Sequence, residues 1–300
     1  MKLKVRTTSV DRLKNSIVPI VSLRKHAILR FTPQGLNVIS SEFNETTVWC
    51  TLAAEIFDIY EVESLRDNTI TIELNIEHLL LVLRQYEKSN ADKITIRLHR
   101  KEATGGGSTT RASKLNLLLN VFFINTISLM STTPVEHTYS IPVTMLKKER
   151  DAKIVEPHLD NIDVMMKLPR DIGLLFKRIE RYKYSDKLNV IGTSAGQLSL
   201  NINVENSMDL TISWNQELEV RELDTEEHTS ASQMDDEEEA GESKYEIQVK
   251  MKDWKLGARL CDFCKNTFLL ISTEEALVLH GYLDEEETCQ IIYFINRLDT

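Results

Sequence analysis

The order of the predicted elements constrains this 300-residue chain more than any single motif does. Hydrophobic alternation and helical spacing predict a strand, a helix and three further strands, and this order occurs four times along the sequence. We expect an α+β fold of two domains with two β-α-β-β-β units each, in which helices cover one face of extended antiparallel sheets. No residue identity repeats at a fixed period, so the repeat is one of element order only.

The predicted domain boundary lies in a charged stretch without apolar alternation. We assign residues 1–143 to an N-terminal domain, 144–157 to a linker and 158–300 to a C-terminal domain. The second domain contains an acidic, apolar-poor loop at 224–243, which its composition predicts to be disordered.

Four helices are predicted, at Ser9–Lys25, Asn75–Lys88, Pro169–Lys183 and Lys252–Lys265. In the third, Ile172, Leu175, Phe176 and Ile179 lie on one side at about 100° per residue, opposite a row of cations. In the first, Pro19 removes a backbone donor and predicts a kink or an early break.

Charge is sorted by element. The four predicted helices carry a net charge of +8 and the whole chain −10, which leaves −18 for the remainder. If the helices share one side of the sheets, they form a basic face without interleaved aromatic residues, which suits a phosphate backbone and not base readout. The candidate DNA-facing residues are Arg12, Lys14, Arg84, Lys88, Arg170, Lys177, Arg178, Arg181, Lys252, Lys255 and Arg259. The alternative is that exposed helix positions simply favour Lys and Arg.

Several other classes of protein find little support in the sequence. The start of the chain has no apolar region typical of a secretory signal, and Leu115–Met130 is too short and too interrupted by Asn to span a bilayer.

Cys261 and Cys264 have the spacing of half a zinc site, but no second pair accompanies them, so we expect packing residues. The Gly105–Ser108 stretch lacks the features of a phosphate-binding loop, and the carboxylates of Asp235–Glu239 cannot hold two metals rigidly. We therefore expect no enzyme.

Scattered segments resemble a known family along the whole chain. They are similar to yeast Hus/Mec-type subunits of the DNA-damage checkpoint clamp, the heterotrimeric nine-one-one (9-1-1) ring related to PCNA. The segments are Ser22–Phe31, Val48–Leu52, Ile154–Pro157, Arg178–Tyr182, Lys252–Lys255 and Gln290–Ile295.

The resemblance implies a PCNA-like sliding-clamp fold with helices lining a channel, no catalytic residues and no cofactor or metal. It implies a ring with two other checkpoint-clamp subunits that encircles double-stranded DNA with recessed ends at damage sites. It also implies an RFC-like clamp loader, recruitment of repair factors, signalling through the checkpoint kinase pathway, a location in the nucleus and no membrane partner. Ser232 precedes a Gln, as in targets of checkpoint kinases, which makes its phosphorylation a hypothesis.

In such rings a strand that ends the first domain pairs with a strand of the neighbour's second domain. The matching stretches here are Glu136–Val143 and Met208–Trp214, and Pro142 in the first is compatible with an edge strand. The candidate interface residues are Glu136, Thr138, Ser140, Met208, Leu210, Ile212 and Trp214, and Ile212→Pro is expected to remove an intersubunit hydrogen bond. The second interpretation is a β-rich interaction scaffold without DNA binding, whose associations would depend little on salt.

Overall fold

The computed structural model describes residues 1–42, 44–89, 91–100, 117–125, 134–179, 181, 185–204, 208–221 and 243–298. The chain divides into two compact units. Unit 1 comprises Met1–Ser41, Val48–Glu156 and Glu286–Ile291, and unit 2 comprises Glu42–Thr47, Pro157–Glu285 and Ile292–Thr300. The stretches Gly105–Ser108 and Asp224–Glu242, with Ser232, lie outside the described residues.

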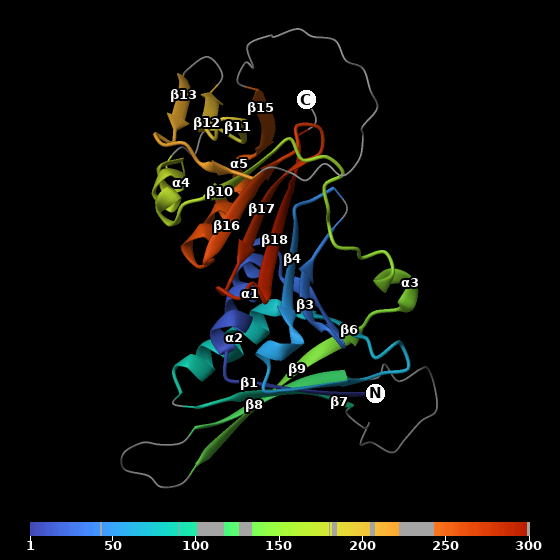
Figure 1. Cartoon of the computed structure of the whole chain (residues 1–300). Coiled ribbons are helices and arrows are strands. Elements are labelled where there is room, and N and C mark those ends of the chain that lie inside the picture. Colours follow the sequence, from blue (N-terminus) through green and yellow to red (C-terminus); the bar gives the residue numbers. More distant parts are fainter. Residues whose placement is uncertain are drawn as a thin grey trace. The chain divides into compact units, whose positions relative to one another are not determined.

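The predicted order of elements is confirmed in the first half of the chain (Figure 1). The first copy contains β1 (Lys2–Thr7), α1 (Val10–Leu23), β2 (His26–Thr32), β3 (Gly35–Ser40) and β4 (Thr47–Ala53), followed by a 3-10 turn (Ala54–Ile56) and the short β5 (Ile59–Glu63). The second contains β6 (Ile70–Asn75), α2 (Ile76–Glu87), β7 (Ile94–Arg100), β8 (Leu117–Asn125) and β9 (Val135–Met145), followed by the short α3 (Lys148–Asp151).

The second half repeats this order. Its first copy contains β10 (Val164–Leu168), a 3-10 turn η2 (Arg170–Ile172) leading into α4 (Gly173–Ile179), then β11 (Lys187–Thr193), β12 (Leu198–Val204), β13 (Met208–Ser213) and the two-residue β14 (Glu219–Val220). Its second contains β15 (Lys244–Lys250), α5 (Met251–Gly257) with a 3-10 extension η3 (Ala258–Asp262), β16 (Asn266–Ile271), β17 (Ala276–Tyr282) and β18 (Cys289–Asn296). The predicted α+β class is thereby confirmed.

The two copies within each unit exchange their first strands. In unit 1, β1 pairs with β7 of the other copy and β6 pairs with β2, all antiparallel. In unit 2, β10 pairs with β16 and β15 pairs with β11 in the same way. The strand order in unit 1 is therefore β4-β3-β2-β6-β9-β8-β7-β1-β5, whereas β13-β12-β11-β15 forms a separate sheet in unit 2.

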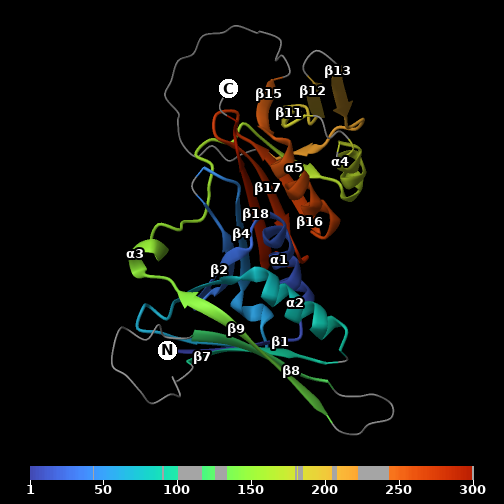
Figure 2. The same cartoon turned by 180° about the vertical axis from the view of Figure 1, so that it is seen from behind.

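Each helix buries one apolar face. In unit 1, α1 and α2 lie side by side on one face of the sheet, with Ile17, Ile20, Leu79 and Leu83 inaccessible to solvent (Figure 2). In unit 2, Trp254 of α5 is 1% exposed and meets the ring of Phe176 edge-on at a centroid distance of 4.9 Å. These contacts turn the opposite face of each helix towards solvent, as the amphipathic patterns predict.

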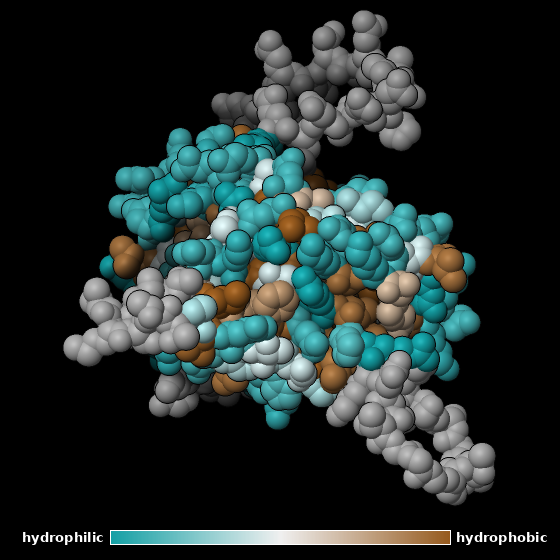
Figure 3. Space-filling model, turned by 90° about the horizontal axis from the view of Figure 1, so that it is seen from below, coloured by the Kyte–Doolittle hydropathy of each residue, from teal (hydrophilic) through white to brown (hydrophobic). Residues whose placement is uncertain are grey.

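The surface has the mixed character of a solvated protein. On the face drawn in Figure 3, hydrophilic side chains cover most of the area and hydrophobic ones form small separate areas. Scattered apolar side chains of this kind are normal on soluble proteins. In the part of the chain that the structure describes, the helices are too short or too polar to cross a bilayer.

Several predicted boundaries are wrong. The helix does not break at Pro19, because α1 continues to Leu23 and the buried Pro19 ring packs in the core at the cost of one backbone hydrogen bond. The predicted helix Pro169–Lys183 is a 3-10 turn and a seven-residue α-helix, and Lys252–Lys265 likewise ends as a 3-10 segment. The predicted strand His158–Leu168 begins only at Val164.

Gly257 marks the closest approach of α5 to its sheet. A Cβ placed there would lie 2.8 Å from the Tyr293 ring and 2.9 Å from Leu279. We expect Gly257→Ala to lower the free energy of unfolding by about 1–3 kcal/mol, because neither buried neighbour has room to move. Urea denaturation measures the change. Gly173→Ala is the control: its Cβ would meet only the Asp262 side chain at 3.4 Å, so its stability should stay equal or rise.

Candidate nucleic-acid interface and subunit edges

Most predicted DNA-facing side chains lie at the solvent-facing surface of the helices. Those exposed to solvent are Arg84, Lys88, Arg170, Arg178, Arg181, Lys177, Lys252 and Arg259, whereas Arg12, Lys14 and Lys255 are half-buried. In unit 1 the contact between α1 and α2 brings Arg12, Lys14, Arg84 and Lys88 onto neighbouring helices. In unit 2, α4 and η3 are in contact, which places Lys177 and Arg259 on adjoining elements. The structure thus gathers cations within each unit.

Acidic partners offset part of this charge. Lys14 forms an ion pair with Glu87 of α2, and Lys177 Nζ lies 3.0 Å from Asp262 of η3. Arg12 lies 3.6 Å from Glu286. These pairs are partly or fully exposed and contribute little to stability, since surface salt bridges are worth about 0–1 kcal/mol. They do hold the cations at defined positions on the helix surfaces.

Among the strands that the structure describes, none pairs with one edge of β9 along most of its length. Its other edge pairs with β8 from Val135 to Val143, whereas β6 pairs only with Val143–Met145. Leu146 donates its backbone N–H to Thr71 at 3.0 Å on the β6 side, and backbone groups alternate sides along a strand. The N–H and C=O groups of Glu136, Thr138 and Ser140 therefore point to the open edge. Pro142 belongs to the same set, so the N–H that it lacks would also have pointed to this edge.

The strand β13 is open on one side as well. It pairs with β12, and no other described strand pairs with it. Trp214 donates its backbone N–H to Leu198 at 2.9 Å, so the backbone groups of Met208, Leu210 and Ile212 point towards β12 by the same alternation. The open backbone groups belong instead to Asp209, Thr211 and Ser213.

This register corrects the expected effect of Ile212→Pro. The N–H of Ile212 belongs to the ladder with β12, so its loss would damage the fold and not an intersubunit contact. Met208, Leu210, Ile212 and Trp214 remain on β13 or directly after it, with Met208 42% exposed, but they contribute side chains and not open backbone groups. The sequence showed that apolar and polar residues alternate along β13. Only a hydrogen bond to a neighbouring strand decides which of the two sets has its backbone groups on the open edge.

Two aromatic side chains beside the β9 edge were missed. His137 and Tyr139 are half-buried and stack on Phe123 at centroid distances of 5.0 and 6.0 Å, and Tyr86 of α2 meets Phe123 edge-on at 5.4 Å. They alternate with the exposed Glu136, Thr138 and Ser140, so the β9 edge has a polar outer side and an aromatic side next to α2. The sequence signal that could have identified them is the alternation of residue types in Glu136–Ser140.

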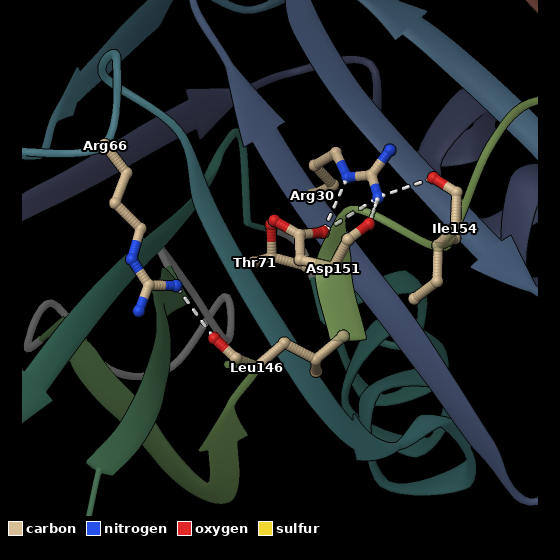
Figure 4. Close-up of polar contacts among 6 residues, drawn as sticks. All are labelled: Arg30, Arg66, Thr71, Leu146, Asp151 and Ile154. Carbon is tan, nitrogen blue, oxygen red and sulfur yellow. Dashed lines mark hydrogen bonds and ion pairs between the residues drawn. The ribbon is translucent and has the colours of Figure 1, made fainter. Parts of the chain in front are cut away.

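The predicted linker 144–157 is not a free tether. Thr144 and Met145 belong to β9, and α3 follows. Figure 4 shows Arg30 of β2 reaching the end of α3: its Nη2 donates to Asp151 Oδ1 at 2.8 Å and to the Ile154 carbonyl at 2.9 Å. Thr71 Oγ1 donates to the other Asp151 oxygen at 2.9 Å, and Arg66 donates to the Leu146 carbonyl at 2.9 Å. Residues up to Ile154 are thereby anchored on unit 1.

The cysteines behave as packing residues. Cys264 is buried and Cys261 is half-buried. Burial raises the pKa of the Cys261 thiol to about 12 and also raises the pKa of Cys264, so both thiols are protonated at neutral pH and poor metal ligands. Within the described ranges, His, Cys, Asp and Glu side chains form no group of three or more that fits a metal ion.

A protein-family model described as Hus1-like protein matches residues 1–299. The chain belongs to the Hus1-like family. The DNA damage checkpoint control protein MEC3 of Eremothecium gossypii is 27% identical over 380 residues, which cover 99% of this chain and 98% of that protein. The checkpoint protein hus1 of Schizosaccharomyces pombe is also 27% identical, over 99% of both chains.

The fold of the Hus1-like chain is that of a sliding clamp. The crystal structure of proliferating cellular nuclear antigen from Entamoeba histolytica matches with a TM-score of 0.70 over 99% of both chains, at 10% sequence identity. The expected PCNA-like fold and the resemblance to yeast Hus/Mec-type proteins are confirmed.

The anchor at Arg30 makes a measurable contribution. Its side chain is 15% exposed and that of Asp151 is 19% exposed. We expect Arg30→Met to lower the free energy of unfolding by about 1–3 kcal/mol, because Asp151 Oδ1 and the carbonyls of Asp151 and Ile154 lose the charged donor that Arg30 supplies. Hydrogen exchange at Ala152 and Ile154, whose amides bond within residues 148–154, should accelerate.

Arg150→Met is the matched control, because Arg150 is 64% exposed and its pair with Glu73 should contribute less than about 0.5 kcal/mol. Equal stability losses in the two variants would contradict the anchoring role of Arg30.

Proposed function

We propose that this Hus1-like chain is a non-catalytic subunit of a ring-shaped DNA-damage checkpoint clamp, which encircles double-stranded DNA with recessed ends at damage sites. The observation that carries this function is the combination of two open strand edges with exposed cations on the helices of both units. Open edges invite pairing with another chain, and cations without interleaved aromatic residues suit phosphates. The names of the family relatives supply the checkpoint role.

In this proposal β9 and β13 each contact a different clamp subunit by strand addition. Three residues on each edge offer their backbone groups: Glu136, Thr138 and Ser140 on β9, and Asp209, Thr211 and Ser213 on β13. Strand addition takes affinity from the main chain and selectivity from side chains on either face. The half-buried His137 and Tyr139 and the apolar side of β13 are the side chains available for that selectivity.

The remaining partners follow from the role of such a ring. A closed ring needs an RFC-like clamp loader to open it before it can encircle DNA. A checkpoint function in the nucleus needs repair factors and the checkpoint kinase pathway to bind the loaded ring. The absence of a catalytic role rests on the family relatives, which are checkpoint proteins, and on the clamp fold.

The edge assignment predicts different outcomes for two neighbouring proline substitutions. Thr211→Pro removes an N–H from the open edge, so the isolated chain should keep most of its melting temperature but fail to enter a ring when co-expressed with two candidate clamp subunits. Ile212→Pro removes an N–H from the β12 ladder and should lower the melting temperature strongly. Circular dichroism and size-exclusion chromatography with light scattering measure the two effects. Normal ring yield with Thr211→Pro would show that β13 is not an assembly edge.

Charge reversal tests DNA binding. We expect Arg170, Arg178 and Arg181 replaced together by Glu to flatten the slope of log affinity against log salt by up to about 3 units, at about 0.9 per phosphate contact. The three side chains are exposed, so folding should survive. Binding should weaken equally on unrelated DNA sequences, because no base edge is read. Fluorescence anisotropy of the assembled ring on a recessed duplex across a salt series is the measurement.

The control reverses Lys147 and Lys148, which are exposed next to α3, and should leave the slope unchanged. A scaffold that does not bind DNA is the competing function. A wild-type ring that does not bind the duplex would support that alternative, and a triple variant that keeps the wild-type slope would show that these arginines do not contact DNA phosphates.

A further inference from the structure

Two leucines lie among exposed charged side chains on α2 and α4. Leu81 is 57% exposed and Leu174 is 66% exposed, although both helices bury other leucines completely or nearly so. Arg84 and Lys88 follow Leu81 by three and seven residues, and Lys177 and Arg181 follow Leu174 by the same intervals. Such intervals place Arg84 and Lys177 about 60° from the leucine around the helix axis, and Lys88, which caps α2, about 20° from it, whereas Arg181 lies beyond the end of α4.

The two leucines occupy equivalent positions in their helices. The residues two before, one after and two after each leucine are buried: Leu79, Val82 and Leu83 for Leu81, and Ile172, Leu175 and Phe176 for Leu174. The same burial pattern occurs at one aliphatic residue in each of the other two helices, and also at the polar Asn15 of α1 and His78 of α2. The two aliphatic residues are Val18 in α1 and Leu256 in α5, both half-buried.

The helices α1, α2, α4 and α5 thus each carry an aliphatic residue in this setting, exposed in α2 and α4 and half-buried in α1 and α5. Each has a cation on the same side, either three residues later or four residues earlier: Lys14, Arg84, Lys177 and Arg259 among them. One exposed leucine needs no explanation. An exposed leucine in the same setting on two helices of different sequence, each with a cation three residues later, points to a contact that covers it.

We propose that Leu81 and Leu174, with Val18 and Leu256 beside them, make apolar contacts with the sugars and groove surface of duplex DNA between the phosphates held by the flanking cations. We assign DNA as the molecule that covers the leucines because of charge: the cations on the same helix faces attract a polyanion. In duplex DNA, the deoxyribose sugars present apolar surface between the phosphates. This inference rests on the proposed function.

The two kinds of contact differ in their response to salt. Phosphate contacts release counterions and set the slope of log affinity against log salt. Burial of a leucine releases no counterion and adds the same affinity at every salt concentration. The leucines would therefore retain the ring on DNA at salt concentrations that weaken the cations.

The test replaces Leu81 and Leu174 by Gln, singly and together, in the assembled ring on a recessed duplex. Each substitution is expected to lower the affinity by about threefold to tenfold at every salt concentration while the slope stays that of the wild type. Leu81→Met with Leu174→Met should retain the wild-type affinity, because Met keeps the apolar surface. Leu65→Gln is the matched control: Leu65 is fully exposed in the turn after β5 and should have no effect.

The outcomes separate this inference from the proposed function. Unchanged affinity in the double Gln variant overturns the leucine contact while leaving DNA binding intact. A flattened slope in that variant also overturns it, because the loss would then come from displaced cations. A wild-type ring that does not bind DNA overturns both proposals. Parallel melting curves of the isolated chains confirm that the variants fold, and an affinity loss shared by Leu65→Gln would count against the contact.

Discussion

The exchange of first strands between neighbouring copies holds each unit together. A copy alone would leave its helix on a short sheet, whereas the pairs β1–β7 and β6–β2 place strands of both copies in each half of the sheet, and β6–β9 joins the two halves. The same exchange occurs in unit 2 through β10–β16 and β15–β11. Because each helix connects strands that belong to different parts of the unit, it must cross the sheet on one face. In unit 1 this places α1 and α2 side by side, with one apolar face each turned inwards.

The open edges are a consequence of this arrangement. Once the first strands are exchanged, β13 has one described neighbour and β9 has a second neighbour only at its last residues. Pro142 lies where the open part of β9 meets the part covered by β6, and its missing N–H points to the open side. A proline in a strand is tolerated there because no ladder bond of the fold is lost.

Cations are concentrated on the helices of this chain, and some of them also form ion pairs with nearby carboxylates. The helices carry most of the excess of cations, yet Lys14 and Lys177 each meet a carboxylate of the same unit. Such pairs are weak in water and are screened further by salt, so they leave the cations able to exchange partners. The anchor at Arg30 differs because it is largely shielded from solvent and binds one carboxylate and two carbonyls. The anchor at Arg30 therefore holds the first residues of the segment that connects the two units on unit 1.

The sequence by itself determined the class and order of the elements. Hydrophobic periodicity located the helix of each copy and nearly every long strand, because burial of one face leaves a period that a single sequence displays, but it did not locate the four-residue α3. It also identified the cations of Pro169–Lys183 as solvent-facing, since they lie opposite Ile172 and Phe176. The α-helix α5 ends at Gly257, earlier than predicted, and α1 continues through Pro19, where an early break was one of the two expected outcomes.

Only the tertiary structure decided the hydrogen-bonding register, the acidic partners of the cations and the anchoring of the linker. Alternation divides β13 into two sets of residues, but the bond from Trp214 to Leu198 is what turns Thr211 and not Ile212 towards the open edge. Arg30 and Asp151 are 121 residues apart, and Lys177 and Asp262 are 85 residues apart. Contacts between such distant residues leave no period in the sequence, because they arise from how the strands are paired and not from the local pattern around either residue.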